Sequence, residues 1–239
     1  MIHSTVIPEP PSALVPVLGE EAFFPVRRIF CVGRNFAEHA REMGMTVERG
    51  RPVFFMKPRE ALQPGGGPIP YPPGTSELHH EVELVAALGA GGAALEEEAA
   101  LGLVFGYAVG LDLTRRDLQA ELKAKGLPWE LAKSFEHSAP ISPIRRWQGP
   151  PPRGEIRLRV NGELRQRAFL SEMIFDVGQV LVWLSRYFEL MPGDLVFLGT
   201  PAGVGPLRPG DRFEAAVEEV GTLEGAIAPA RSGSTLSAA

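Results

Sequence analysis

Short segments of strand-forming residues, separated by turn signals, run through most of this chain and restrict its fold more than any other feature. The clearest case is a β-hairpin, in which residues 155–160 and 163–168 flank the pair Asn161-Gly162. An Asn-Gly pair favours the two-residue turn that joins antiparallel strands. The pattern therefore predicts a protein built from many short strands.

The remaining segments predict a mixture of strands and helices. Further strands are predicted at 29–33, 52–57, 79–88, 104–113, 195–199, 212–219 and 223–227. Helices are predicted at 35–44 (with Asn35 as the N-cap and Gly44 as the C-cap), 114–125 and 176–188. Residues 58–76 and 139–153 are rich in Gly or Pro and are predicted to be irregular. Strands and helices do not alternate regularly, so the expected fold class is α+β.

The two ends of the chain differ from its middle. Prolines at positions 8, 10 and 11 argue against an early helix, so residues 1–28 are expected to form an N-terminal leader segment with some strand. Residues 229–239 are small and polar, and we expect a poorly ordered tail. The N-terminus lacks the pattern of a signal peptide, which makes a cytoplasmic location the default expectation.

Composition excludes several classes of protein. Apolar residues make up 44% and charged residues 22%, which excludes a disordered chain. The net charge is -5 and the basic residues are scattered, so we expect no nucleic-acid partner. The most apolar stretch, 101–111, is too short to cross a membrane. The single cysteine, Cys31, cannot form an internal disulfide and is interpreted as a small core residue.

Glu81 and Glu83 lie in one predicted strand, and their spacing places both side chains on the same face. A solvated strand face is the ordinary explanation for such a pair. Here, however, residues 85–88 continue the strand as a buried run. Because unpaired buried charge is costly, the pair needs a partner, and a bound cation would provide one.

Asp112 adds a third carboxylate at the end of the apolar run 104–111. It could equally cap the helix that follows. If it joins Glu81 and Glu83, the site has only oxygen ligands, which suits Mg²⁺, Mn²⁺ or Ca²⁺ better than Zn²⁺. Such a site would leave positions for a chelating substrate and water.

Other polar residues fit roles in catalysis. His39 and Glu42 stand three apart on a predicted helix and can touch, which suits a general base, although a surface pair is the commoner explanation. Lys133 lies between apolar residues and could hold an oxyanion, or it could be an ordinary surface lysine. The glycine-rich loop 199–206, with Thr200, could bind a carboxylate through its backbone N–H groups.

Taken together and in this order, these segments resemble the fumarylacetoacetate hydrolase family, and most closely its short, single-domain, acylpyruvate-hydrolase-like branch. The resemblance covers residues 29–228, which would form the catalytic domain. The matching pieces are Cys31-Val32-Gly33-Arg34-Asn35-Phe36, His39-x-x-Glu42, Phe55-Met56-Lys57-Pro58, His80-Glu81-Val82-Glu83-Leu84, Gly106-Tyr107 through Gly110-Leu111-Asp112-Leu113-Thr114-x-Arg116-Asp117-x-Gln119, Gly126-Leu127-Pro128-Trp129-x-x-Ala132-Lys133-Ser134-Phe135, Val160-Asn161-Gly162-Glu163, Met173-Ile174-Phe175, Pro192-Gly193-Asp194 and Gly199-Thr200-Pro201-x-Gly203-Val204-Gly205-Pro206.

The resemblance implies a mixed β-roll with short peripheral helices, in a protein that is usually a homodimer. It implies a divalent metal, with Mg²⁺ expected first and Mn²⁺ or Ca²⁺ as alternatives, bound by Glu81, Glu83 and Asp112. It also implies that His39 and Glu42 lie on a mobile lid helix.

For the substrate, the resemblance implies a small 2-oxo acid. The implied contacts come from Arg34, Arg116, Gln119, Lys133 and Thr200. Phe36 replaces a frequent Tyr, and residues 136–138 replace a small, polar stretch. Both departures leave the identity of the substrate open.

The implied reaction is hydrolysis of a carbon–carbon bond in an acylpyruvate such as fumarylpyruvate or acetylpyruvate. His39 with Glu42 would activate water, while Lys133 and Gln119 would stabilise the oxyanion. The same residues would also suit an isomerase or tautomerase, of the type that acts on 2-hydroxyhepta-2,4-diene-1,7-dioate, or an oxaloacetate decarboxylase. A metal-binding ligand module without catalysis is the alternative from another class, but it would not need His39 and Glu42.

Overall fold

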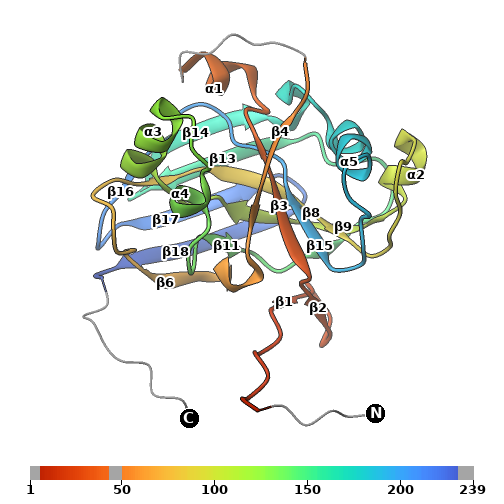
Figure 1. Cartoon of the computed structure of the whole chain (residues 1–239), viewed down its shortest axis with the longest axis horizontal. Coiled ribbons are helices and arrows are strands. Elements are labelled where there is room, and N and C mark those ends of the chain that lie inside the picture. Colours follow the sequence, from red (N-terminus) through yellow and green to blue (C-terminus); the bar gives the residue numbers. More distant parts are fainter. Residues whose placement is uncertain (1–5, 43–49, 231–239) are drawn as a thin grey trace.

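A computed structural model describes residues 6–42 and 50–230 of the chain, and it confirms the α+β fold as a mixed β-roll (Figure 1). The largest sheet has eight strands and mixes parallel with antiparallel pairs. Seven of them follow the order β4-β3-β15-β8-β9-β11-β5, and β12 pairs with β9. Their bounds are β3 (Arg28–Gly33), β4 (Val53–Lys57), β5 (Leu62–Pro64), β8 (Val82–Leu88), β9 (Val104–Leu111), β11 (Ala139–Ile141), β12 (Arg145–Arg146) and β15 (Asp194–Phe197).

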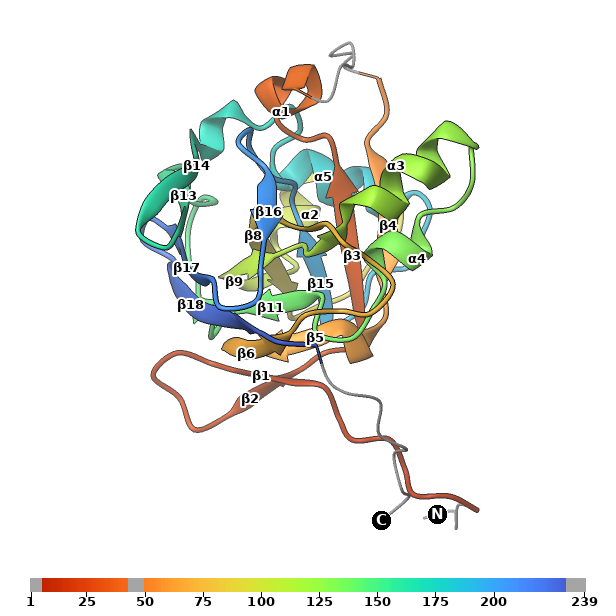
Figure 2. The ribbon, with the colours of Figure 1, turned by 90° about the vertical axis from the view of Figure 1, so that its left-hand side faces the viewer.

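A second sheet of five strands curls beside the first and encloses the main core with it (Figure 2). Its order is β14-β13-β17-β18-β6. The bounds are β6 (Gly66–Pro70), β13 (Glu155–Val160), β14 (Glu163–Phe169), β17 (Arg212–Val217) and β18 (Gly221–Ala228). A small sheet of β7 (Leu78–His80), β10 (Thr114–Arg115) and β16 (Gly205–Leu207) completes this part of the fold.

Strand β8 shows why the central sheet has continuous apolar runs. All of its residues are buried. Val82 and Leu84 face the core between the two large sheets, whereas Val85 and Ala87 belong to a second core on the other face. A sheet that is covered on both sides favours apolar residues at every position, so its strands lack the alternation of apolar and polar residues.

The second core draws on the N-terminal segment that the sequence indicated as a leader. Residues in this segment form a hairpin of β1 (Leu14–Pro16) and β2 (Phe23–Pro25). Val15 and Phe24 are buried there beside strands of the large sheet. The predicted tail, 229–239, lies almost wholly outside the described residues.

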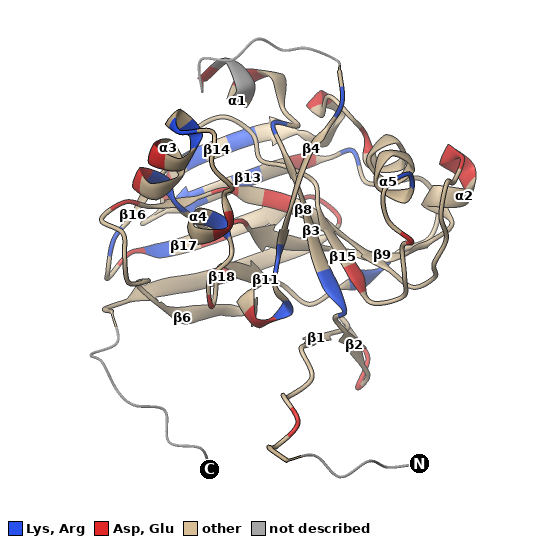
Figure 3. Ribbon diagram, viewed as in Figure 1, with Lys and Arg blue, Asp and Glu red and all other residues tan. Residues whose placement is uncertain are grey.

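The helices are short and peripheral, as expected. They are α1 (Ala37–Glu42), α2 (Glu97–Leu101), α3 (Arg116–Ala124), α4 (Glu130–Lys133) and α5 (Val177–Ser185), with 3₁₀ turns η1 (Arg59–Ala61) and η2 (Leu170–Glu172). Figures 1 and 2 place α1 at one end of the molecule and α3 and α4 along one side. Among the described residues, no helix is long and apolar enough to cross a membrane. Figure 3 shows acidic and basic residues interspersed over the ribbon.

Two local predictions are confirmed by backbone geometry. Asn161 and Gly162 have φ values of 52° and 82°, so both adopt the left-handed conformation that the predicted hairpin turn requires. Helix α5 begins with a capping box, in which the Asp176 carboxylate accepts from the Gln179 N–H at 2.9 Å. This cap explains why the helix starts where the sequence indicated.

Three other predictions are wrong. The segment 139–153 is not irregular throughout, because it contributes β11 and β12 to the eight-stranded sheet. The segment 58–76 is not a loop throughout, because it contributes strands β5 and β6 at the ends of the two large sheets. Edge strands tolerate the Pro and Gly residues that made this segment look irregular. Asn35 does not act as an N-cap: its amide donates to the carbonyls of Phe175 and Leu198 and accepts from the Phe175 N–H, all between 2.8 and 2.9 Å.

The pairing of β6 with β18 makes a prediction for stability. Gly66 lies opposite Gly225, and a Cβ atom on Gly225 would lie 1.6 Å from the Gly66 carbonyl oxygen. Because the backbone itself is in the way, we expect Gly225→Ala to lower the free energy of unfolding by about 3 kcal/mol, at the upper end for overpacking. Urea unfolding, followed by tryptophan fluorescence, measures the change. Gly50→Ala is the control, because no described atom lies within 4 Å of the added Cβ; equal stability of the two variants would contradict the close pairing.

Candidate active site

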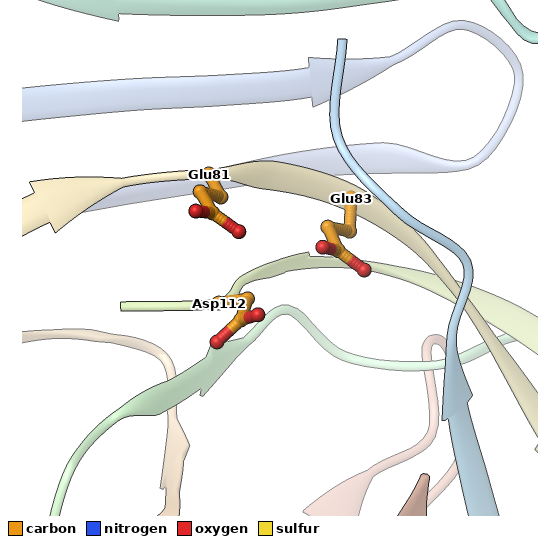
Figure 4. A group of neighbouring side chains, drawn as sticks. All are labelled: Glu81, Glu83 and Asp112. Carbon is orange, nitrogen blue, oxygen red and sulfur yellow. The ribbon is translucent and has the colours of Figure 1, made fainter. Parts of the chain in front are cut away.

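The three carboxylates singled out from the sequence meet in the interior (Figure 4). One oxygen of each of Glu81, Glu83 and Asp112 lies within 4.8 Å of the others, and all three residues are buried. Glu81 connects β7 to β8, Glu83 lies within β8, and Asp112 follows β9. Pairing of β8 with β9 continues past the strand ends, where the Asp112 N–H donates to the Glu81 carbonyl at 2.9 Å. The antiparallel ladder therefore brings the carboxylates together.

Lys133, at the end of α4, joins two of these carboxylates. Its Nζ lies 2.9 Å from Glu81 Oε2, 2.6 Å from Asp112 Oδ2 and 2.6 Å from Thr114 Oγ1. Burial opposes the charge of Lys133, but Asp112 and then Glu81 outweigh it and raise the pKa of the ammonium group. The predicted alternative of a surface lysine is therefore wrong.

Lys57 is a second buried lysine at the same carboxylates, and the sequence analysis assigned it no role. Its Nζ donates to Ser138 Oγ at 3.0 Å, to the Leu113 carbonyl at 3.2 Å and to the Lys133 carbonyl. It also lies 2.9 Å from Asp112 Oδ1, as an ion-pair partner that is not aligned as a hydrogen-bond donor. Lys57 does belong to the Phe55-Met56-Lys57-Pro58 piece of the family resemblance, and this was its signal in the sequence.

Glu81 and Glu83 differ in their charge environment. Burial opposes ionisation of Glu81, but the positive charges of Lys133 and Arg116 outweigh it and hold the pKa of Glu81 below its ordinary value. Burial raises the pKa of Glu83 well above its ordinary value, and repulsion from Asp112 and Glu81 adds to this. Glu83 accepts one hydrogen bond from the Gly199 N–H, at 2.7 Å. A cation among the three carboxylates would relieve this repulsion.

The oxygens present fit a divalent cation. Among the described residues, Asp112 Oδ1 is buried and has no hydrogen-bond donor aligned with it, which is costly unless another ligand uses the oxygen. The donor set consists of carboxylates alone, which suits a hard cation such as Mg²⁺ or Mn²⁺.

His39 and Glu42 lie together on α1, beside the carboxylates. His39 Nδ1 is 3.4 Å from Glu42 Oε2, and the imidazole is buried. Burial lowers the pKa of His39, and the nearby Glu81 and Glu42 offset part of this effect. Glu42 Oε2 also accepts from the Gly203 N–H at 3.1 Å, so α1 is attached to the glycine-rich loop.

The predicted substrate contacts gather around the same pocket. Arg116 donates to Glu81 Oε1 and to Gln119 Oε1. Arg34, Gln119 and Thr200 also line the pocket. The complete lining is Val32, Gly33, Arg34, His39, Phe55, Glu81, Glu83, Asp112, Arg116, Gln119, Lys123, Trp129, Lys133 and Thr200. Of the predicted site residues, only Glu42 does not line the pocket directly.

The pocket is also lined by three residues to which no role was assigned from the sequence, namely Phe55, Lys123 and Trp129. Lys123 Nζ lies 5.7 Å from the centre of the Trp129 ring. Burial and then the positive charges of Arg34 and Arg116 lower the pKa of Lys123. Lys123 follows Gln119 by one helical turn, but this spacing alone does not separate it from a surface lysine.

Comparison with known proteins identifies the family. Residues 28–228 match the family model of the fumarylacetoacetate (FAA) hydrolase C-terminal domain. The chain belongs to the fumarylacetoacetate hydrolase family. The match spans the domain expected at 29–228 and supports the single-domain branch.

Its relatives within the family are enzymes with different activities, and the chain is an enzyme of this family. It is 46% identical over 196 residues to the mitochondrial oxaloacetate tautomerase of Mus musculus, covering 81% of this chain and 88% of the relative. The crystal structure of fumarylpyruvate hydrolase from Pseudomonas aeruginosa, in complex with Mn²⁺ and pyruvate, is 44% identical, with a TM-score of 0.91 and coverage of 95% of this chain and 100% of that chain. The crystal structure of 2-hydroxyhepta-2,4-diene-1,7-dioate isomerase from Mycobacterium marinum is 33% identical, with a TM-score of 0.76. It covers 90% of this chain and 77% of that chain. The Mn²⁺ complex and the carboxylate triad together support a divalent metal.

The carboxylate triad predicts a measurable metal site. Glu83→Gln replaces one anionic ligand, so we expect the affinity for Mn²⁺ to fall by roughly 100-fold, the upper end of what the loss of a supporting contact costs in metal sites. Titration of Mn²⁺, followed by electron paramagnetic resonance, measures the free ion. Glu224→Gln, at an exposed glutamate of β18, should leave the affinity unchanged. Equal affinities of wild type and Glu83→Gln would exclude Glu83 as a ligand.

The size of the pocket makes a prediction for α1. The cavity is about 40 Å³, which holds a few water molecules at most. A 2-oxo acid can enter only if part of the wall moves, and α1 has only six residues, too few to be stable alone. We expect oxalate with Mg²⁺ to slow hydrogen–deuterium exchange in residues 37–42, while exchange in the β13–β14 hairpin stays the same. Exchange in α1 that is slow already and insensitive to oxalate would contradict a lid.

Proposed function

We propose that the protein is a divalent-metal-dependent hydrolase that cleaves a carbon–carbon bond in acylpyruvates of the fumarylpyruvate type. The observation that carries the proposal is the position of His39, a buried imidazole in the same pocket as three convergent carboxylates. The structure of the hydrolase from Pseudomonas aeruginosa supports this choice. Its similarity covers 95% of this chain, and that structure is a complex with Mn²⁺ and pyruvate. A homodimer, which the family resemblance implies, is part of the proposal.

The metal in this proposal is Mg²⁺, held by Glu81, Glu83 and Asp112. When bound there, the cation supplies Lewis-acid chemistry to the keto and carboxylate oxygens of a 2-oxo acid. The protein's own contribution is to exclude bulk water, orient the substrate and move protons.

His39 is the general base of the proposed reaction. Its lowered pKa keeps the imidazole neutral near neutral pH, so it can accept a proton. Glu42 lies against Nδ1 and leaves Nε2 as the nitrogen that can meet a water molecule. The water oxygen attacks the distal carbonyl of the substrate, and the carbon–carbon bond breaks with its electron pair moving to the pyruvate fragment. The proton taken by His39 can then return to that fragment.

Lys133 and Gln119 are proposed to stabilise the oxyanion. Lys133 already donates to Glu81, Asp112 and Thr114, which accounts for all three N–H groups of an ammonium. It can therefore donate to a substrate only when one of these bonds is released. Gln119 is buried and its carbonyl accepts from Arg116, so its amide N–H groups are the part that can serve an oxyanion.

Basic residues at the pocket favour an anionic substrate. Arg34, Arg116 and Lys123 line one cavity, and the lowered pKa of Lys123 reflects burial first and then the repulsion from the two arginines. A second carboxylate on the substrate, as in fumarylpyruvate, would relieve that repulsion. We therefore propose that dicarboxylic 2-oxo acids bind more tightly than acetylpyruvate.

Oxaloacetate tautomerisation is the second candidate, and the 46% identity to the mouse tautomerase favours it. That reaction moves a proton between carbon and oxygen and needs no attack by water. The same pocket can support it, because the substrate is again a small dicarboxylic 2-oxo acid. Isomerase and decarboxylase activities draw on the same residues.

Substitution of His39 separates the candidate reactions that need activation of water from the candidate reactions that do not. For His39→Gln we expect kcat for fumarylpyruvate cleavage to fall by on the order of a hundredfold, because the base is lost. Decarboxylation of oxaloacetate should fall less, whereas Glu81→Gln should damage both reactions. Steady-state assays at saturating Mg²⁺ measure kcat, and Glu38→Gln, on the same helix, is the control. Intact cleavage by His39→Gln would show that another group is the base.

If wild-type protein does not cleave acylpyruvates at all, the hydrolase proposal fails. Acceleration of oxaloacetate keto–enol exchange by the same preparation would then establish the second candidate.

A further inference from the structure

We infer that Gln166 is a positioning residue that fixes the direction of the Thr200 hydroxyl, so that this hydroxyl donates its proton to a carboxylate oxygen of the substrate. The inference deepens the proposed function and rests on it for the substrate class. Gln166 lies on β14, far along the chain from the other residues of the pocket, and it does not line the pocket itself.

The orientation of the Gln166 amide follows from two backbone groups. Its Oε1 lies 3.1 Å from the Val82 N–H, which can only donate. Its Nε2 lies 2.8 Å from the Pro201 carbonyl oxygen, which can only accept. Rotating the amide by half a turn would place donor against donor and acceptor against acceptor in a buried site, at a high cost. The positions of the oxygen and the nitrogen are therefore determined.

That orientation determines the role of Thr200. Gln166 Nε2 donates to Thr200 Oγ1 at 2.8 Å, so the hydroxyl oxygen is the acceptor in this bond. Its own proton must then point elsewhere. Among the described residues, Thr200 has no acceptor for it, although the residue is buried and lines the pocket. A carboxylate oxygen of a bound substrate would be the acceptor that the Thr200 hydroxyl lacks.

The Oε1 end of the Gln166 amide is likewise held by two hydrogen bonds. Gln166 Oε1 accepts from His80 Nδ1 at 2.9 Å as well as from Val82 N–H. Both residues flank Glu81, so the amide connects the strand of the carboxylates to the loop of Thr200. The loop also packs closely on β14 at Gly203, where a Cβ atom would lie 2.0 Å from the Arg165 carbonyl oxygen. Gln166 is thus held rigidly enough to set one proton direction.

Gln166→Glu tests this role, because it keeps the shape of the side chain and replaces the donor with an acceptor. Thr200 would then turn its proton toward residue 166 and away from the substrate. We expect the Kd for pyruvate in the Mn²⁺-loaded protein, and KM for fumarylpyruvate, to rise about tenfold, since one hydrogen bond to a charged group is lost. The value of kcat should change less than twofold. Gln148→Glu, at an exposed glutamine, is the control for the added charge.

A double-mutant cycle with Thr200→Val separates positioning from other effects. In wild type, Thr200→Val should raise the pyruvate Kd about tenfold; in Gln166→Glu, it should raise it less than twofold, because the bond is already lost. Additive effects in the cycle would overturn the inference, because repulsion by the new charge or a general loss of stability would leave the contribution of Thr200 intact. A melting temperature measured for each variant checks that all are folded. Since pyruvate binding is measured without turnover, the outcome stands even if wild type fails to cleave acylpyruvates.

Discussion

Burial of three carboxylates at one point is the constraint on which the rest of the site depends. Glu81, Glu83 and Asp112 are each at most 5% exposed, and mutual repulsion adds to the cost of burial. Lys57 and Lys133 supply two buried positive charges against them, and Arg116 supplies a third that is partly exposed. Every one of these cations is held by additional hydrogen bonds to carbonyl or hydroxyl groups, amides or imidazole nitrogens. The site is therefore a network in which each charge is fixed by several others.

The double-sided burial of the central sheet makes such a network possible. Because core residues cover both faces of β8, the side chain of Glu83 cannot reach solvent from either face of the strand. Its carboxylate must find partners at the open end of the ladder, where Asp112 and the Gly199 N–H lie. The hairpin of β1 and β2, which covers the second core, thus contributes to the site although it contains none of its residues.

Local patterns along the chain were enough to predict part of this arrangement. The Asn161-Gly162 hairpin, the start of α5 and the Glu81–Glu83 face depend on neighbours within a few residues, and the structure reproduces them. Strands β5 and β6 were missed because their Gly and Pro residues are explained only by distant partners at a sheet edge. Lys57 and Gln166 were missed for the same reason, since each acts on groups more than thirty residues away.

The glycine-rich loop brings these observations together, because it bonds three separate parts of the site. The Gly199 N–H bonds Glu83, Thr200 is held by Gln166, and the Gly203 N–H bonds Glu42 on α1. The position of the proposed general base therefore depends on the same short segment that orients a carboxylate and a proposed substrate contact. Two different residues of the loop make these contacts, since Gly199 bonds Glu83 and Gly203 bonds the helix that carries His39. Hydrolysis requires a water molecule at the substrate and proton transfer alone does not, so the proposed hydrolase activity depends on the geometry of this loop and of the helix that it holds.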